Sequence, residues 1–281
     1  MVKLHNVLNS DLNLKIFVCV KQVPGVAEVR IDPKTNTLVR EGVPSIMNPY
    51  DRNAIELALS IKEERGAKVI ALSMGPPQAE EVLREALAMG TDEAYHLTDR
   101  AFAGADTLAT SYTLALAIRK ILKESKKDET YLIICGSQAI DGDTGQVGPE
   151  LAEELGIPQI TYVQKFNFKG DKIILERAFR AEEVVIIESN LPALITVLKE
   201  INKPRYPTML GVMNAYEKKK IIQLNAENLK AEKAKIGLTG SMTEVWRIFI
   251  PERKGEHLIL EGSIQEMATK LCENLKDDKV L

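Results

Sequence analysis

The residues best suited to chemistry lie in a stretch rich in glycine and aspartate, residues 136–148, between an apolar run and a helical pattern. Its glycines let the backbone approach a ligand closely or adopt positive φ. Residues 144–147 lie just before the expected helix, whose free N–H groups attract phosphate. Asp143 would repel a phosphate if it pointed inward, so we expect it to cap the helix or bind a ribose hydroxyl. The P-loop lysine is absent, which argues against NTP hydrolysis of that type.

A second stretch, residues 98–107, also ends where a helix is expected to begin. Asp106 or Thr107 would cap that helix, and Thr110 would add a hydroxyl near its N-terminus. Arg100 would supply positive charge to a pyrophosphate bound there. A capped helix beside a solvated arginine explains this segment equally well.

The sequence offers no pairing of a nucleophile with a base. His96 lies inside an apolar run and is more typical of a core or edge residue than of a general base. There is no Gly-x-Ser-x-Gly sequence and no cluster of cysteine with histidine. The three cysteines (Cys19, Cys135 and Cys272) form no CxxC pair. We therefore expect no metal site, no disulfide framework and no catalytic side chain, so a bound cofactor would carry the chemistry.

The elements that would position these stretches alternate between strand and helix. Apolar runs at 16–20, 69–74, 94–97 and 131–135 are each followed by a loop and a helical pattern. One such helix would have Asn48 as its N-cap and Gly66 beyond its end. The pattern predicts an α/β fold with a doubly wound, mostly parallel sheet. The loops after these runs, which include 21–25 and 75–77, would share one carboxyl edge. Any one of them is consistent with a surface turn, but together they favour a nucleotide site.

The second half of the chain does not continue the alternation of strand and helix. Residues 166–168 and 173–175 flank a short turn and predict an antiparallel hairpin, to which Val184–Ile187 adds a third strand. Leu191–Leu198 would return to the core as a buried strand. Beyond Tyr216 the chain is polar, apart from Val245–Ile250 and an amphipathic helix at Ile264–Leu275. We expect an N-terminal extension (1–14), a nucleotide-binding domain (15–215) with a hairpin insertion near 164–188, and an extended C-terminal arm (216–281) against a partner subunit.

Composition and charge exclude several classes of function. The 281 residues include 37 basic and 40 acidic side chains, a net charge of −3, so no basic excess favours nucleic acid or anionic lipid. No apolar run approaches the roughly 20 residues that span a bilayer. The first 15 residues contain no apolar core of an export signal. We expect a cytoplasmic protein that binds no nucleic acid and crosses no membrane.

Several short sequences resemble the beta subunit of electron-transfer flavoproteins, over roughly residues 15–250. The matching stretches are Cys-Val-Lys-Gln-Val-Pro (19–24), Asn-Pro-Tyr-Asp (48–51), Met-Gly-Pro-Pro-Gln (74–78), Ala-Leu-Ala-Met-Gly (86–90), Gln-Ala-Ile-Asp (138–141) and Asn-Lys-Pro-Arg-Tyr (202–206). Any one of these alone is a weak signal, whereas together they are specific.

The resemblance implies a heterodimer with an alpha subunit that holds FAD, and an adenine nucleotide in this chain. In ordinary members that nucleotide is a structural AMP. In electron-bifurcating members it is a second FAD that accepts a hydride from NADH and passes electrons to the alpha-subunit FAD and to ferredoxin or flavodoxin. Residues 99–111 and 141–149 look like the bifurcating type, so we expect FAD in preference to AMP. A non-redox nucleotide-binding regulator is a third reading.

The resemblance and the loops together give the expected site residues. Those expected to bind the nucleotide are Cys19, Pro24, Asn48, Asp51, Met74, Gly75, Asp99, Arg100, Gly104, Asp106, Thr107, Thr110, Gly136, Gln138, Ala139, Asp143, Thr144, Gly145, Gln146 and Val147.

Residues 199–215 resemble the loop that docks the family's partners, which implies contacts from Pro204, Arg205, Tyr206 and Met209 to an acyl-CoA dehydrogenase-like protein or another flavin or quinone oxidoreductase. Ordinary members place a leucine where Met209 stands. Methionine also fills an adaptable apolar pocket, so docking would survive with a different partner. A proline-braced surface loop is the alternative.

Overall fold

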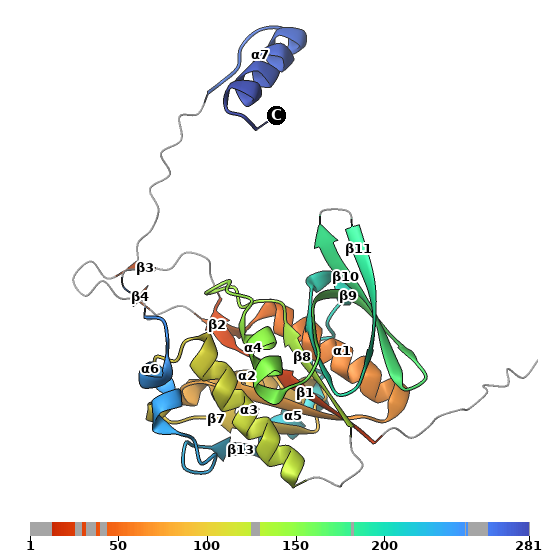
Figure 1. The fold of residues 1–281 in the computed structure, drawn as a ribbon, viewed down its shortest axis with the longest axis vertical. Coiled ribbons are helices and arrows are strands. Elements are labelled where there is room, and N and C mark those ends of the chain that lie inside the picture. The colour runs from red at the N-terminus through yellow and green to blue at the C-terminus, as the bar shows by residue number, and fades with distance from the viewer. Residues whose placement is uncertain are drawn as a thin grey trace, which may run out of the picture.

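A nine-stranded sheet forms the centre of the protein, with the strand order β11-β10-β9-β12-β8-β1-β6-β7-β13 (Figure 1). The computed structural model describes residues 13–25, 30–31, 38–39, 44–124, 130–180, 183–244, 246 and 258–280. Most of the N-terminal extension and of the apolar patch Val245–Ile250 therefore lies outside the described residues.

Seven neighbouring strands of the sheet, β9-β12-β8-β1-β6-β7-β13, run parallel to one another. They are β1 (Leu14–Cys19), β6 (Lys68–Met74), β7 (Glu93–Leu97), β8 (Thr130–Gly136), β9 (Gln159–Lys169), β12 (Ala193–Val197) and β13 (Ile221–Leu224). Two antiparallel pairs lie outside this sheet: β2 (Gln22–Pro24) with β5 (Ser45–Met47), and β3 (Arg30–Ile31) with β4 (Leu38–Val39).

Helices cover both faces of the parallel sheet. On one face, α1 (Pro49–Arg65) and α2 (Glu80–Met89) bury Ile55 and Leu83 against the strands. On the other face, α3 (Thr107–Lys123) and α4 (Val147–Leu155) bury Ile118 and Leu151. Because both faces are covered, the strands are continuous apolar runs, and the predicted doubly wound α/β fold is confirmed.

The predicted hairpin and its third strand are confirmed. β10 (Lys172–Arg180) pairs antiparallel with β9 across a turn at Gly170, where φ is +62°, and β11 (Glu183–Asn190) adds antiparallel to β10. The three strands extend beyond the helix-covered part of the sheet (Figure 1). The buried returning strand is β12, whose five residues are all buried.

The first part of the expected C-terminal arm instead belongs to the sheet. β13 pairs parallel with β7, and Leu224, Leu229 and Ile236 are buried in the core on the α3–α4 face. The sequence reading missed β13 because four residues beside a lysine run give too short a signal. Further along, α7 (Ile264–Asp277) confirms the predicted terminal helix; it is mostly exposed and lies apart from the sheet (Figure 1).

Two further α-helices are short: α5 (Met209–Glu217), which packs on α2, and α6 (Gly237–Gly240), which packs near α3. Four single-turn 3-10 helices, η1 (Pro77–Ala79), η2 (Arg100–Phe102), η3 (Lys199–Ile201) and η4 (Lys233–Lys235), also lie in the described ranges. Across the described ranges, no helix has the length and apolar character needed to cross a membrane.

Candidate functional site

The chain reverses its winding direction between β1 and β8. β1 is hydrogen-bonded to both β8 and β6; the chain leaves β1 through α1 on one face and leaves β8 through α4 on the other. In open α/β sheets, ligands bind at such a reversal, outside the carboxyl ends of the strands. We call this region, with residues 20–25 and 137–146 after the two strands, the switch-point site.

Asp51, in the first turn of α1, is the buried centre of the switch-point site. Its Oδ2 accepts a hydrogen bond from the backbone N–H of Lys21 at 2.8 Å, and its Oδ1 accepts one from Asn48 Nδ2 at 2.9 Å. The backbone of Gly136 also donates to this carboxylate, which therefore joins the ends of β1 and β8 to α1. Burial raises the pKa of Asp51 to about 7, although the three hydrogen bonds favour the charged form.

Asn48 links α1 to the loop after β8. Its Nδ2 also donates to the carbonyl oxygen of Gln138 at 2.9 Å, and its Oδ1 accepts from the backbone N–H of Ile140 at 3.3 Å. Asn48 occupies the N-cap position of α1 as predicted, but its side chain makes no capping hydrogen bond because these partners use it. The base of the loop is thereby fixed to the first turn of α1.

Only glycine fits at position 136. A Cβ atom there would overlap Asp51 Oδ1 and would lie 2.7 Å from Tyr50 Cβ. The absence of a side chain lets β8 approach α1 closely enough for the backbone of Gly136 to reach the buried carboxylate. The predicted close approach at this glycine is made to the protein's own α1.

The outer part of the loop, by contrast, is exposed. Residues 141–144 are exposed, and Ala139 closes a turn by accepting backbone hydrogen bonds from Gly142 and Asp143. Lys21 Nζ lies 2.7 Å from Asp141 Oδ1 and bridges the loops after β1 and β8. Such exposed ion pairs add little stability, so this bridge orients the loop more than it strengthens it.

The N-terminus of α4 carries no side-chain cap. We expected Asp143 either to cap α4 or to bind a ribose hydroxyl. It does not cap the helix, because the chain turns away at a φ of +50°, and its carboxylate instead accepts a hydrogen bond from Gln138 Nε2 at 2.7 Å. The N-cap position belongs to Gln146, whose side chain makes no capping bond, and Gly145 precedes it with φ +63°. Within the described ranges, the first N–H groups of α4 therefore face no side-chain acceptor, and this arrangement fits a phosphate.

In the loop after β7, two aspartates bind backbone N–H groups of the chain itself. Asp106 caps α3 as predicted by accepting from the backbone of Ala109, and its Oδ2 also accepts from the N–H groups of Met242 and Thr243. Asp99 accepts from the backbone of Ala101 and Ala226. Both carboxylates thus hold the segment that follows β13.

Arg100 is the cation of this loop, and Gly104 and Thr110 lie near it in sequence. Arg100 is exposed, and within the described chain its guanidinium has no hydrogen-bond or ion-pair partner. Gly104 has φ +74° and lies against Leu238 of α6. Thr110 belongs to the first turn of α3, where its N–H donates to the backbone oxygen of Asp106.

The N-termini of α3 and α4 lie side by side. Thr107 Oγ1, from the first residue of α3, donates to Glu150 Oε1 in the first turn of α4 at 3.1 Å. Ser111 Oγ donates to the other oxygen of Glu150 at 3.2 Å. The structure therefore brings the two predicted phosphate-binding segments together, through a glutamate that the sequence reading did not single out.

The other predicted residues lie along the same carboxyl edge. Cys19 and Cys135 are register partners at the ends of β1 and β8, and Met74 ends β6. Gly75 donates its N–H to the backbone oxygen of Leu97 at 3.1 Å. Pro24, in β2, lies farther along the loop after β1.

His96 lies in β7 as predicted. It is fully buried, with Nε2 3.2 Å from the backbone oxygen of Gly75. Burial lowers the pKa of His96, which favours the neutral ring.

The predicted docking residues lie just before α5 and at its first residue. Tyr206 and Met209 are 88% and 80% exposed, and Leu210 and Met213 extend this apolar surface onto α5. Pro204 is half-buried. Arg205 differs from its neighbours because its side chain is turned toward α1.

Sequence reasoning placed Lys21 in a candidate loop without naming it as a site residue, and it missed Glu150 and the segment at 242–243. The pairing of Lys21 with Asp141 joins residues 120 positions apart, and no local pattern indicates it. Glu150 stands in the first turn of a helix, where an acidic residue is common for dipole reasons alone.

The fold defines an α/β protein of the doubly wound class, with a candidate nucleotide site at its switch point. Residues 35–243 match the family model described as the electron transfer flavoprotein domain. The electron transfer flavoprotein subunit beta of Thermoanaerobacterium thermosaccharolyticum is 53% identical over 270 residues, 95% of this chain and 100% of the relative. The chain therefore belongs to the electron transfer flavoprotein family, as a relative of its beta subunits.

Two other relatives have names that refer to reductases. The caffeyl-CoA reductase-Etf complex subunit CarD of Acetobacterium woodii is 48% identical over 270 residues, covering 95% of this chain and 100% of the relative. The acryloyl-CoA reductase electron transfer subunit gamma of Anaerotignum propionicum is 42% identical over 274 residues, covering 95% of this chain and 100% of the relative.

Proposed function

We propose that this chain is the beta subunit of a heterodimeric electron-transfer flavoprotein and that it binds FAD at the switch-point site. The observation that carries the proposal is the pairing of two helix N-termini, through Thr107 and Glu150, beside the uncapped start of α4. AMP has a single phosphate, whereas FAD has a pyrophosphate and a flavin beyond it. The exposed Arg100, in the loop that the Thr107–Glu150 bond joins to α4, would supply positive charge to the pyrophosphate of the longer ligand.

The residues of the site have distinct roles in this proposal. Thr144, Gly145 and the N–H groups of α4 bind phosphate, and Asp143 is placed for a ribose hydroxyl. Asp51 and Asn48 do not contact the nucleotide in this proposal; they hold the loops after β1 and β8 in place. When bound, FAD supplies the hydride-accepting and one-electron chemistry, for which the chain itself provides no side chain.

The proposed reaction moves the two electrons of a hydride from NADH along separate routes. One electron passes to the FAD of an alpha subunit and the other to a low-potential acceptor such as ferredoxin or flavodoxin. Residues 199–215 dock an acyl-CoA dehydrogenase-like protein or another flavin or quinone oxidoreductase. The reductase names of two relatives support this class of partner.

An ordinary carrier that holds AMP is the second candidate, and the loop after β7 favours it. The carboxylate of Asp106 already caps α3, and a negative charge there opposes a second phosphate. AMP needs only the start of α4 and the loops around Asp51. The two candidates therefore differ in whether the loop after β7 takes part in binding.

Replacing Arg100 with alanine separates these candidates. The heterodimer stripped of nucleotide is titrated with FAD and with AMP in a calorimeter, and Arg180→Ala, at an exposed arginine on β10, is the matched control. We expect about tenfold weaker FAD binding with AMP binding unchanged, since a lost charge-assisted contact costs about 1.5 kcal/mol. An equal loss of affinity for FAD and for AMP would show that Arg100 does not contact the pyrophosphate.

Anaerobic reduction by NADH tests the redox part of the proposal. We expect NADH to reduce the wild-type heterodimer and, when ferredoxin and an oxidised acyl-CoA dehydrogenase are both present, to deliver one electron to each route. A heterodimer that accepts electrons only from an acyl-CoA dehydrogenase and not from NADH is an ordinary carrier.

A further inference from the structure

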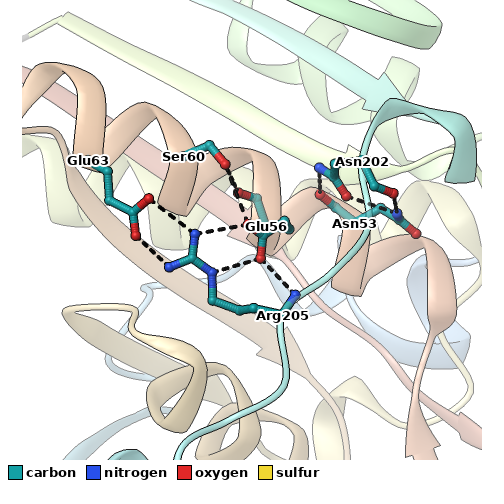
Figure 2. Close-up of polar contacts among 6 residues, drawn as sticks. All are labelled: Asn53, Glu56, Ser60, Glu63, Asn202 and Arg205. Atoms are coloured by element: carbon teal, nitrogen blue, oxygen red, sulfur yellow. Dashed lines mark hydrogen bonds and ion pairs between the residues drawn. The ribbon is translucent and has the colours of Figure 1, made fainter.

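Arg205 connects the docking segment to α1 through five hydrogen bonds (Figure 2). Its backbone N–H and Nε donate to Glu56 Oε2 at 2.9 and 2.8 Å, and Nη2 donates to Glu56 Oε1 at 2.9 Å. Nη1 donates to Glu63 Oε1 at 2.5 Å. One guanidinium thus joins two carboxylates that lie seven residues apart, two turns along the same helix face.

A pair of asparagines fixes the chain three residues earlier. Asn53 Nδ2 donates to the backbone oxygen of Asn202 at 2.9 Å, and Asn202 Nδ2 donates to the backbone oxygen of Asn53 at 3.0 Å (Figure 2). Asn53 is 4% exposed, and Glu56 is 8% exposed. We call Asn53, Glu56, Glu63, Asn202 and Arg205 the α1 latch.

The α1 latch replaces secondary structure in this part of the chain. Residues 202–208 lie between the short helix η3 (Lys199–Ile201) and α5 and belong to neither helix nor strand. Within the described chain, the hydrogen bonds of residues 203–207 are those of Arg205. The next anchor is in α5, where Arg84 Nη1 donates to the backbone oxygen of Ala215. The exposed side chains of Tyr206 and Met209 lie between these two anchors.

The charges make the latch strong enough to fix a conformation. Bidentate arginine–carboxylate contacts are among the strongest hydrogen bonds in proteins, and burial of Glu56 shields its contact from water and salt. The neighbouring guanidinium lowers the pKa of Glu63 and the two carboxylates raise that of Arg205, so both partners stay charged.

We propose that Asn53, Glu56 and Glu63 are positioning residues that hold residues 202–205 on α1, so that Tyr206, Met209 and Leu210 meet the partner flavoprotein already ordered. Arg205 then acts within the chain and not on the partner. The latch lowers the entropy cost of docking, since the segment is ordered before the partner arrives. This role rests on the docking function proposed above for residues 199–215.

The decisive variant is Glu56→Ala/Glu63→Ala, which frees Arg205 without removing it. The heterodimer is assayed for hydrogen exchange of residues 203–213 and for binding to a purified acyl-CoA dehydrogenase that reoxidises the wild type. We expect faster exchange at the Arg205 amide and about tenfold weaker binding, the cost of ordering one or two extra side chains. Nucleotide content stays unchanged.

Three further variants separate positioning from contact. Arg205→Ala has the same effect as the double variant, and combining the two adds nothing, because both break one latch. Glu63→Ala removes only the exposed end and gives a smaller effect of the same sign, even if loss of Glu56 prevents folding. Met209→Asp weakens binding at wild-type exchange rates.

Two results would overturn the positioning role. One is faster exchange with wild-type affinity in Glu56→Ala/Glu63→Ala. The other is weak binding in Arg205→Ala together with wild-type binding in Glu56→Ala/Glu63→Ala, which would place the guanidinium on the partner. Unchanged affinity in Met209→Asp would instead overturn the docking function, while the exchange rates would still report whether the latch holds the segment.

Discussion

The loops after β7 and β8 have similar compositions but different hydrogen-bond partners in the fold. Both combine small residues with an aspartate just before a helix, and both were predicted to bind phosphate. In the loop after β7, Asp106 caps α3 and binds the N–H groups of Met242 and Thr243. In the loop after β8, the carboxylate of Asp143 bonds only to Gln138 among the described residues, and α4 begins without a side-chain cap.

This difference shows that a helix N-terminus becomes a ligand site only when the rest of the chain leaves it free. The N–H groups of both helices attract acceptors equally by their geometry. The acceptor for α3 comes from the helix's own N-cap, and the segment after β13 then covers that end. Among the residues that the structure describes, no side chain caps α4, which is why the switch-point site is the stronger candidate for nucleotide.

The largest expected effect comes from closing the base of the loop after β8. Gly136→Ala places a Cβ on Asp51 Oδ1 and should lower the free energy of unfolding by about 3 kcal/mol or more. Gly142→Ala, in the exposed part of the same loop, meets nothing within 4 Å and should change it by less than about 0.5 kcal/mol. Urea unfolding of the two heterodimers measures both values, and equal stabilities would show that the base is not packed as described.

The pH dependence of stability tests the same base through Asp51. Burial raises the pKa of Asp51 from 3.8 to about 7, so between these values the folded chain binds a proton that the unfolded chain releases. This contribution to stability is present at low pH and lost as the pH rises toward 7. From pH 5 to 7, unfolding free energy should fall by about 2 kcal/mol more in the wild type than in Asp51→Asn. Parallel pH profiles would contradict the raised pKa.

Two glycine substitutions in left-handed backbone, one at the start of α4 and one at its end, distinguish an effect on nucleotide binding from an effect on folding. Gly145→Val and Gly156→Val each force a side chain into left-handed backbone, at φ +63° and +69°, and should each cost about 1–2 kcal/mol. Gly145 precedes α4 at the site, whereas Gly156 ends the same helix. We expect nucleotide to be lost from the first variant and retained in the second. Nucleotide retained by Gly145→Val would place the binding loop elsewhere.

The smallest effect compares the two aspartates directly. Asp106→Asn turns an amide NH₂ toward the N–H donors of residues 242 and 243 and should cost about 1 kcal/mol, with faster hydrogen exchange there. Asp143→Asn keeps an acceptor for Gln138 and should stay within about 0.5 kcal/mol of the wild type. The comparison between the loops fails if the order is reversed.

The fold was predictable because its strands carry their own signal. β1, β6, β7 and β8 are apolar runs buried on both faces, and each is followed by a helix with clear ends, such as Gly66 at φ +72°. β13 was not predictable, since its burial depends on pairing with β7 more than 120 residues away and not on its own four residues.

The candidate site was predictable in its backbone but not in its long-range contacts. The glycines and helix starts indicated where phosphate would bind, and the family resemblance indicated Asn48 and Asp51. The bond from Thr107 to Glu150 and the turn of Arg205 toward Glu56 join separate segments through single side chains. Periodicity and local propensity report neighbours along the chain, so they carry no information about such pairs.

The measurement that tests the central claim most directly is the nucleotide content of the chain co-expressed with its alpha subunit, after acid release and chromatography. The account predicts two FAD per heterodimer and no AMP. One FAD with one AMP would contradict it, because the switch-point site would then hold only a structural nucleotide and the loop after β7 would play no part in binding.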